Sequence, residues 1–122
     1  KGLKKSHVLF GQPYIQECEY VCVTEGPLDA IWMNQLGYPT VALLGMSMSN
    51  KQRDLLLTLP TKEIILCLDN DDAGKIGKDR AFKLLHNKTR VSTIDIPKEY
   101  KDVQDIKSCD ILKNVINNKK YW

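Results

Sequence analysis

Carboxylates in three separated segments are the residues of this sequence best suited to chemistry. They are Glu25, Asp69, Asp71 and Asp102. The first three stand at the exits of apolar runs of about the length of a β-strand, and Asp102 lies in the loop after another such run. Crowded carboxylates repel one another, so such a cluster is tolerated where a cation or another positive group lies among them. Because all of these ligands are hard oxygens, the cation we predict is magnesium.

Four apolar runs predict the strands that would position these acids: residues 20–24, 40–44, 63–68 and 90–96. Both alternating faces of these runs are apolar almost throughout, which is typical of strands buried on both sides of a sheet. Segments of helical periodicity alternate with them, at 27–36, 49–59, 73–86 and after Asp102. This alternation with short connections predicts an α/β fold, a central parallel sheet of about four strands with helices on both faces.

Local signals predict the ends and the buried faces of these helices. Ser49 and Gln52 have the spacing of a capping box, and Asp71 or Asp72 is expected to cap the helix that follows. The predicted buried positions are Leu28, Ile31, Trp32 and Leu36 in the first helix, Ala73, Ile76, Gly77, Ala81, Leu84 and Leu85 in the third, and Val103, Ile106, Ile111, Leu112, Val115 and Ile116 in the last. Residues 117–120 are expected to form a frayed polar tail.

The predicted topology brings the acids together. In an open parallel sheet the carboxyl ends of the strands share one edge, and ligands bind there. Glu25, Asp69 and Asp102 come from three such exits, so together they predict a divalent metal site. Metal ions in such sites can clamp the attacking and leaving oxygens of a phosphoryl transfer.

The acidic segment fits two further kinds of site less well. A calcium-binding EF-hand loop that begins at Asp69 would place Ala73 and Arg80 where the loop requires acidic or amide ligands. A phospho-acceptor aspartate of the response-regulator kind would also lie at a strand exit, but it leaves the pair Glu25 and Asp29 unexplained. In the first turn of a helix, Asp29 alone could simply complement the helix dipole.

Size and composition point to one soluble domain. The chain has 122 residues, is 43% hydrophobic and carries a formal charge of +3. It contains no apolar stretch that could span a bilayer and nothing like a signal peptide, so we expect a cytoplasmic protein with no membrane partner. We interpret the four cysteines, Cys18, Cys22, Cys67 and Cys109, as reduced core residues, a zinc site being disfavoured. The absence of an initiator Met suggests a piece of a longer polypeptide.

Five segments resemble the Toprim domain of bacterial and phage DNA primases. Glu25-Gly26-Pro27-Leu28-Asp29 is similar to the family's Glu-Gly-x-x-Asp motif, and Asp69-Asn70-Asp71-Asp72-Ala73-Gly74 to Asp-x-Asp-x-Ala-Gly. Leu44–Ser47 resembles the Leu-Gly-Thr-Ser stretch that follows the second strand, and 101–105 the late Lys-Asp-x-Asn-Asp segment. The stretch 5–11 resembles the basic stretch that leads into the domain. The resemblance therefore divides the chain into a lead-in segment, residues 1–17, and a Toprim domain, residues 18–122.

The resemblance implies a Toprim fold, which is Rossmann-like, and magnesium-dependent template-directed synthesis of RNA primers, with manganese as a possible substitute. It implies catalytic roles for Glu25, Asp29, Asp69 and Asp71, and metal binding by Glu25, Asp69, Asp71 and Asp102. Either Gln104 or Asp105 would correspond to the second acid of the family's late motif and would bind or support the metal. Lys4, Lys5 and Lys75 would contact nucleic acid or nucleotide phosphates.

The implied partners are a single-stranded DNA template, ribonucleoside triphosphates and a replicative helicase, in the same chain or separate. Two alternatives remain open. A Toprim nuclease, of the OLD type or like a maturation ribonuclease, would share the metal site and cut phosphodiesters. A fragment that binds nucleic acid or a replication partner without activity of its own would also fit these residues.

Overall fold

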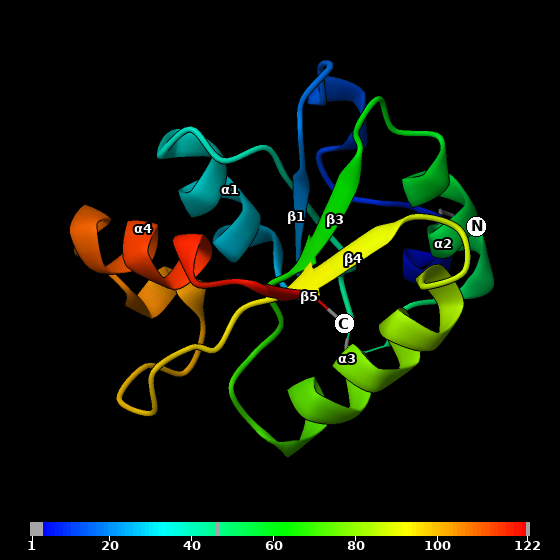
Figure 1. Ribbon diagram of the computed structural model, residues 1–122. Helices are drawn as coiled ribbons and strands as arrows, with labels where there is room; N and C mark the ends of the chain where they lie inside the picture. Colours follow the sequence, from blue (N-terminus) through cyan, green and yellow to red (C-terminus); the bar gives the residue numbers. More distant parts are fainter. Residues whose placement is uncertain (1–3, 46, 122) are drawn as a thin grey trace.

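The fold is built around one five-stranded sheet, which lies at the centre of Figure 1. The computed structural model describes residues 4–45 and 47–121. The strand order is β2-β1-β3-β4-β5; β2, β1, β3 and β4 are parallel, and β5 runs antiparallel to β4. The strand bounds are β1 Val21–Thr24, β2 Thr40–Ala42, β3 Glu63–Leu66, β4 Arg90–Thr93 and β5 Lys120–Tyr121.

Helices cover both faces of this sheet, as the sequence predicts. α2 (Asn50–Leu57) and α3 (Asp72–Leu85) lie on one side, and α1 (Pro27–Gln35) and α4 (Cys109–Asn117) lie on the other (Figure 1). The described residues also form three short 3-10 helices: η1 Lys5–His7, η2 Gln12–Tyr14 and η3 Val103–Asp105. The alternating β-α order and the parallel core of the sheet are therefore confirmed.

Each face of the sheet has its own hydrophobic core. In β3, Ile64 and Leu66 face the α2–α3 side, whereas Ile65 faces the α1–α4 side. The first core contains Leu56 of α2 and Leu85 of α3, and the second contains residues of α1 and α4. Because successive strand residues point to opposite faces, two cores require apolar residues at every position, which explains the unbroken apolar runs.

The buried face of α1 differs from the prediction, whereas that of α3 agrees with it at Gly77, Ala81 and Leu85 and differs at Ile76. In α1 the buried residues are Asp29, Ala30 and Met33, whereas Leu28 is 61% exposed and Ile31 is 42% exposed. In α3, Ile76 is exposed, and the buried stripe is Gly74, Gly77, Ala81 and Leu85. In α3 the inward face is made mostly of small residues, which lets the backbone approach its neighbours closely and leaves Ile76 outside. In α1 the packing buries Ala30 and Met33 in place of Leu28 and Ile31.

The C-terminal part also departs from the prediction. Instead of one helix after Asp102, there is η3 and then α4, whose first turn is capped by the Ser108 hydroxyl; Ile111 is exposed. The predicted frayed tail is wrong as well, because its end forms β5 beside β4, where Lys120 pairs with Asp95 at 2.8 Å.

The cysteines and the start of the chain agree with the sequence-based expectations only in part. Cys22 and Cys67 are buried as predicted, but Cys109 is exposed and Cys18 half-buried; all four are free thiols. Within the lead-in segment, Leu9 is buried and Phe10 forms a bridge with Ala42. The described part of this segment thus packs on the domain, and its boundary at residue 17 stays a prediction. Among residues 4–45 and 47–121, no helix combines the length and apolarity that crossing a membrane requires.

Candidate metal site

Acidic side chains from four elements meet at the carboxyl edge of the sheet. They line a pocket of about 610 Å³ together with lead-in residue Lys5 and residues after β1 and β2. Its lining residues are Lys5, Glu25, Gly26, Pro27, Leu28, Asp29, Leu44, Gly45, Asp69, Asp102 and Gln104. The predicted convergence of Glu25, Asp69 and Asp102 is therefore confirmed as a geometrical fact.

Three of these carboxylates are close enough to share an ion. Asp29, Asp69 and Asp102 each offer an oxygen, and the three oxygens lie within 4.8 Å of one another. Asp69 Oδ1 is buried and has no hydrogen-bond partner among the described residues. An unsatisfied buried carboxylate oxygen is costly, and a bound cation would satisfy it. The donor set, all carboxylate oxygens beside an open pocket, fits magnesium, which keeps several waters and takes a few carboxylates.

The backbone of Asp69 is fixed by two close contacts. Its N–H donates to Glu25 Oε2 at 3.0 Å, which joins the exits of β1 and β3. On its other side lies Gly74 of α3, where an added Cβ would come 2.0 Å from the Asp69 carbonyl oxygen. Only a residue without a side chain permits this approach. The glycine of the acidic segment thus sets the position of Asp69, a role that the sequence alone did not predict.

The other two acids are held by the loop that carries η3. Asp29 Oδ1 accepts from the Gln104 N–H at 3.2 Å, which binds this loop to α1. Asp102 caps η3 by accepting from the Asp105 N–H at 3.0 Å. The loop is also tied to the segment after β3, because the Asn70 N–H donates to the Lys101 carbonyl at 2.8 Å.

Burial and crowding favour the protonated forms of Asp29, Asp69 and Glu25 by raising the pKa of each carboxyl. Desolvation, followed by the charge of Asp102, raises the pKa of Asp29 to about 7. The same two causes raise the pKa of Asp69 to about 6, with a smaller contribution from Asp71. Burial also raises the pKa of Glu25, against the opposing effect of its hydrogen bond from Asp69. Perturbed carboxylates gathered in a pocket are typical of a functional site.

The remaining predicted residues fall into two groups. Lys5 and Gln104 line the pocket, and Gln104 reaches Asp29 through its backbone. Asp71 caps α3 by accepting from the Gly74 N–H at 2.7 Å, so the cap is Asp71 and not Asp72. Residues outside the pocket lining are Asp71, Asp105, Lys4 and Lys75; Asp105 accepts from the Lys101 N–H at 2.9 Å. The roles of all these residues stay predictions.

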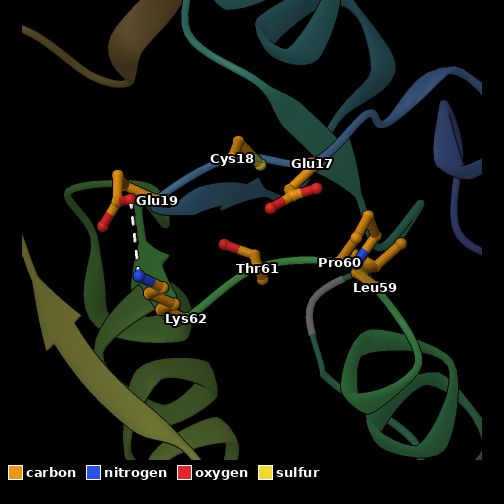
Figure 2. A pocket seen from close by; sticks show the side chains of 7 residues that line it. All are labelled: Glu17, Cys18, Glu19, Leu59, Pro60, Thr61 and Lys62. Carbon is orange, nitrogen blue, oxygen red and sulfur yellow. Dashed lines mark ion pairs between the residues drawn. The ribbon is translucent and has the colours of Figure 1, made fainter.

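A larger pocket, of about 810 Å³, lies at the opposite edge of the sheet. Figure 2 shows its lining, with Glu17, Cys18 and Glu19 before β1 and with Pro60, Thr61 and Lys62 before β3. Here Glu19 pairs with Lys62 at 3.7 Å, and both side chains are about four-fifths exposed. Since no described acids gather there around a buried unsatisfied oxygen, size alone does not make this pocket the functional site.

The sequence of residues 22–107 matches the model of the family described as Toprim-like. The chain belongs to the Toprim-like family. The DNA primase of Thermotoga maritima is 33% identical over 106 residues, which are 84% of this chain and 19% of that protein. This chain therefore spans about a fifth of the length of that curated relative. The similarity to primases predicted from the motifs is confirmed.

Solved structures agree with this assignment. The Aquifex aeolicus primase, in a structure of its zinc-binding and RNA polymerase domains, has a TM-score of 0.83 and 29% identity, covering 98% of this chain and 32% of that one. The primase fragment of the bacteriophage T7 primase-helicase has a TM-score of 0.72 and 26% identity, and the match covers 92% of this chain and 47% of that one. The predicted Toprim fold is thus confirmed.

Proposed function

We propose that this chain is the metal-binding part of a DNA primase and serves magnesium-dependent, template-directed synthesis of RNA primers. The observation that carries the proposal is the group Asp29, Asp69 and Asp102 with its unsatisfied buried oxygen, in a Toprim-like domain similar to primases. Magnesium or manganese bound there would neutralise phosphate oxygens and align a nucleotidyl transfer.

The residues that line the pocket would have three different roles in this reaction. Asp29, Asp69 and Asp102 would hold the metal, since their oxygens lie within 4.8 Å of one another. Glu25 would accept the proton of the attacking hydroxyl, because its raised pKa brings it closer to a general base and it lines the same pocket. Lys5, the cationic side chain among the pocket-lining residues, would bind phosphate oxygens.

The partners follow from the same comparison. We propose a single-stranded DNA template, ribonucleoside triphosphates and a replicative helicase. A related solved primase fragment comes from a primase-helicase protein, and a solved primase catalytic domain similar in fold is described as bound to single-stranded DNA. Because the chain spans only part of its relatives, these partners are proposed for the protein in which it acts.

Primer synthesis by the protein containing this chain tests the proposal. Single-stranded DNA and labelled ribonucleotides would be supplied with magnesium, with and without Asp69→Asn. We expect labelled primers from the wild type and at least a hundredfold fewer from the variant, since a metal ligand is lost. Degradation of the DNA without incorporation would indicate a Toprim nuclease. Neither product from a protein that binds magnesium would indicate a binding domain without turnover.

A further inference from the structure

The side chain of Gln52, in the first turn of α2, makes more hydrogen bonds than its helix cap requires. It is 1% exposed. Its Oε1 accepts from the Ser49 N–H at 3.0 Å, which completes the capping box predicted from the sequence. The amide Nε2 is not needed for that cap, and it lies near three other carbonyls: Leu43 at 2.7 Å, Val8 at 3.0 Å and Lys5 at 3.1 Å.

These carbonyls belong to two segments that contribute to the lining of the acidic pocket, one at Lys5 and one at Leu44 and Gly45. Lys5 is the first residue of η1 and Val8 follows its last, and Leu43 follows β2 directly before Leu44, which lines the pocket. Ser49 strengthens the same junction, because its hydroxyl donates to the Ser6 carbonyl. The side chains of the α2 capping box therefore hold residues 5–8 on the domain by hydrogen bonds. The two that Gln52 makes, to Lys5 and Val8, span 47 and 44 positions of the sequence.

The attachment of residues 5–8 affects where the positive charge of Lys5 lies. Lys5 is the cationic residue among those that line the pocket, and it shares that lining with Glu25, Asp29, Asp69 and Asp102. A lysine side chain has a flexible four-carbon stem, so its ammonium group is localised only as well as its backbone is. The amide of Gln52 bonds the carbonyl of Lys5 itself, which fixes the start of that stem.

We propose that Gln52 is a positioning residue that fixes Lys5 at the rim of the acidic pocket, where the ammonium group binds the phosphates of a nucleoside triphosphate. The identity of the ligand rests on the proposed function, whereas the attachment of Lys5 rests on the hydrogen bonds alone. Two experiments on this chain separate these parts.

The first experiment measures the attachment without any ligand. In Gln52→Met the side chain keeps its length but loses the amide, and in Gln52→Glu it keeps an acceptor for Ser49 while losing the donors. The amide of His7 donates to Lys4 and that of Val8 to Lys5, so both report on η1. We expect both variants to speed hydrogen exchange at these two amides at least tenfold. Unchanged exchange in the variants that fold would overturn the proposal.

Asn34→Ala is the matched control for that experiment. Asn34 is another bridging amide, and it bonds the carbonyls of Ala30 and Thr40 and the Thr40 N–H instead of the lead-in segment. Loss of the Asn34 amide should lower the stability of the whole domain. Exchange at the His7 and Val8 amides should then speed up no more than global unfolding of the domain requires. If Asn34→Ala exposes these amides as much as Gln52→Met does, the effect is general destabilisation and the proposal fails.

The second experiment is a double-mutant cycle on binding of ATP with magnesium. Lys5→Ala and Gln52→Met should each weaken binding about tenfold, the size of one charge-assisted contact. The double variant should be at most about twofold weaker than either single variant, because both remove the same contact. Losses that multiply to about a hundredfold would overturn the positioning role. A wild type that binds no ATP would reject the proposed ligand, and the exchange data would then decide the attachment by themselves.

Discussion

Two carboxylates at opposite ends of β3 show what separates a structural acid from a candidate ligand. Glu63 opens the strand, is 7% exposed, and pairs with Lys119 at 3.0 Å while accepting from the Ser92 hydroxyl at 2.6 Å. Asp69 follows the strand and lies among other acids, with its Oδ1 buried and unpaired among the described residues. Lys119 is the counter-ion of Glu63, whereas among the described residues Asp69 forms no ion pair within 4.0 Å and the charge of Lys101 opposes the raised pKa of its carboxyl.

A buried carboxylate therefore indicates a functional site when it lacks a hydrogen-bond or ion-pair partner, and its charge alone does not. Glu63 is buried and Asp69 is partly buried, so both carboxylates carry a desolvation cost that must be offset. At the Glu63 end the C-terminal strand brings Lys119 and Tyr121 to the carboxylate, whose second oxygen lies 3.4 Å from the Tyr121 hydroxyl. At the Asp69 end the neighbouring elements bring further carboxylates. Substitutions at the two ends should consequently have opposite effects.

The largest effect is expected from Gly74→Ala, which disturbs the Asp69 end alone. The added Cβ would come 2.0 Å from the Asp69 carbonyl oxygen, so the backbone must move. We expect the free energy of unfolding to fall by about 4 kcal/mol, with loss of detectable magnesium binding. Urea denaturation and isothermal titration measure the two quantities. Gly45→Ala is the control for stability, since no atom lies within 4 Å of its added Cβ. Equal stability of the two variants would contradict the contact.

Glu63→Ala tests the other end of the strand. It leaves Lys119 partly buried without its partner and removes an acceptor from Ser92. We expect a loss of about 3 kcal/mol in the free energy of unfolding and unchanged magnesium affinity. Glu19→Ala removes an ion pair whose members are both about four-fifths exposed, so it should cost about 0.5 kcal/mol or less. If Glu63→Ala weakened magnesium binding while folded, the two ends would not be independent.

Asp69→Asn should act in the opposite direction on stability. Removing one charge from the cluster relieves repulsion, so the metal-free protein should become more stable at pH 7.5, by about 1 kcal/mol after allowance for its partial exposure. Magnesium affinity should fall at least tenfold. Denaturation in the presence of a chelator and titration with magnesium measure these effects. A less stable variant would mean that the Asp69 carboxylate has a structural partner after all.

The pH dependence of the metal-free protein has a defined sign. The pKa of Asp29 rises to about 7 and that of Asp69 to about 6, above the ordinary values of aspartate. The folded state therefore binds protons more tightly than the unfolded state does. Its stability should fall as pH rises from about 4 to about 7. Denaturation curves across this range should show the decline, smaller in Asp69→Asn and opposed by magnesium. A flat profile in both proteins would show that these acids are not perturbed.

Local signals explain why much of the site could be predicted from the sequence. Apolar runs that end in acids fix Glu25 and Asp69 at strand exits, and the capping box of Ser49 and Gln52 follows from spacing alone. Once the order of elements predicts a parallel sheet, these exits must share an edge. The convergence of the acids therefore depends on topology, which a short sequence with clear alternation reveals.

What the sequence could not reveal depends on contacts between distant residues. In α1 two apolar stripes have the same helical period, and only packing against the sheet selects Ala30 and Met33 over Leu28 and Ile31. The strand β5 has two residues and no apolar pattern; it is held by Lys120 on Asp95 and by Arg90 over the Tyr121 ring at 4.0 Å. Likewise, the need for glycine at position 74 appears only when Asp69 lies beside it.

The smallest expected effects distinguish the two acids that begin α3. Asp71 caps the helix, whereas Asp72 lies in the first turn and is exposed. Asp71→Ala should lower the free energy of unfolding by about 1 kcal/mol, and Asp72→Ala by about 0.3 kcal/mol through the helix dipole. Asp71→Asn keeps a side-chain oxygen for the cap and removes the charge, so its effect on magnesium binding is not confounded by loss of the helix start. Asp71 lies outside the group Asp29, Asp69 and Asp102. We therefore expect the magnesium affinity of Asp71→Asn to be only two- to threefold lower than that of the wild type, through loss of a nearby charge. A loss as large as that of Asp69→Asn would instead make Asp71 a direct ligand, as the sequence predicts.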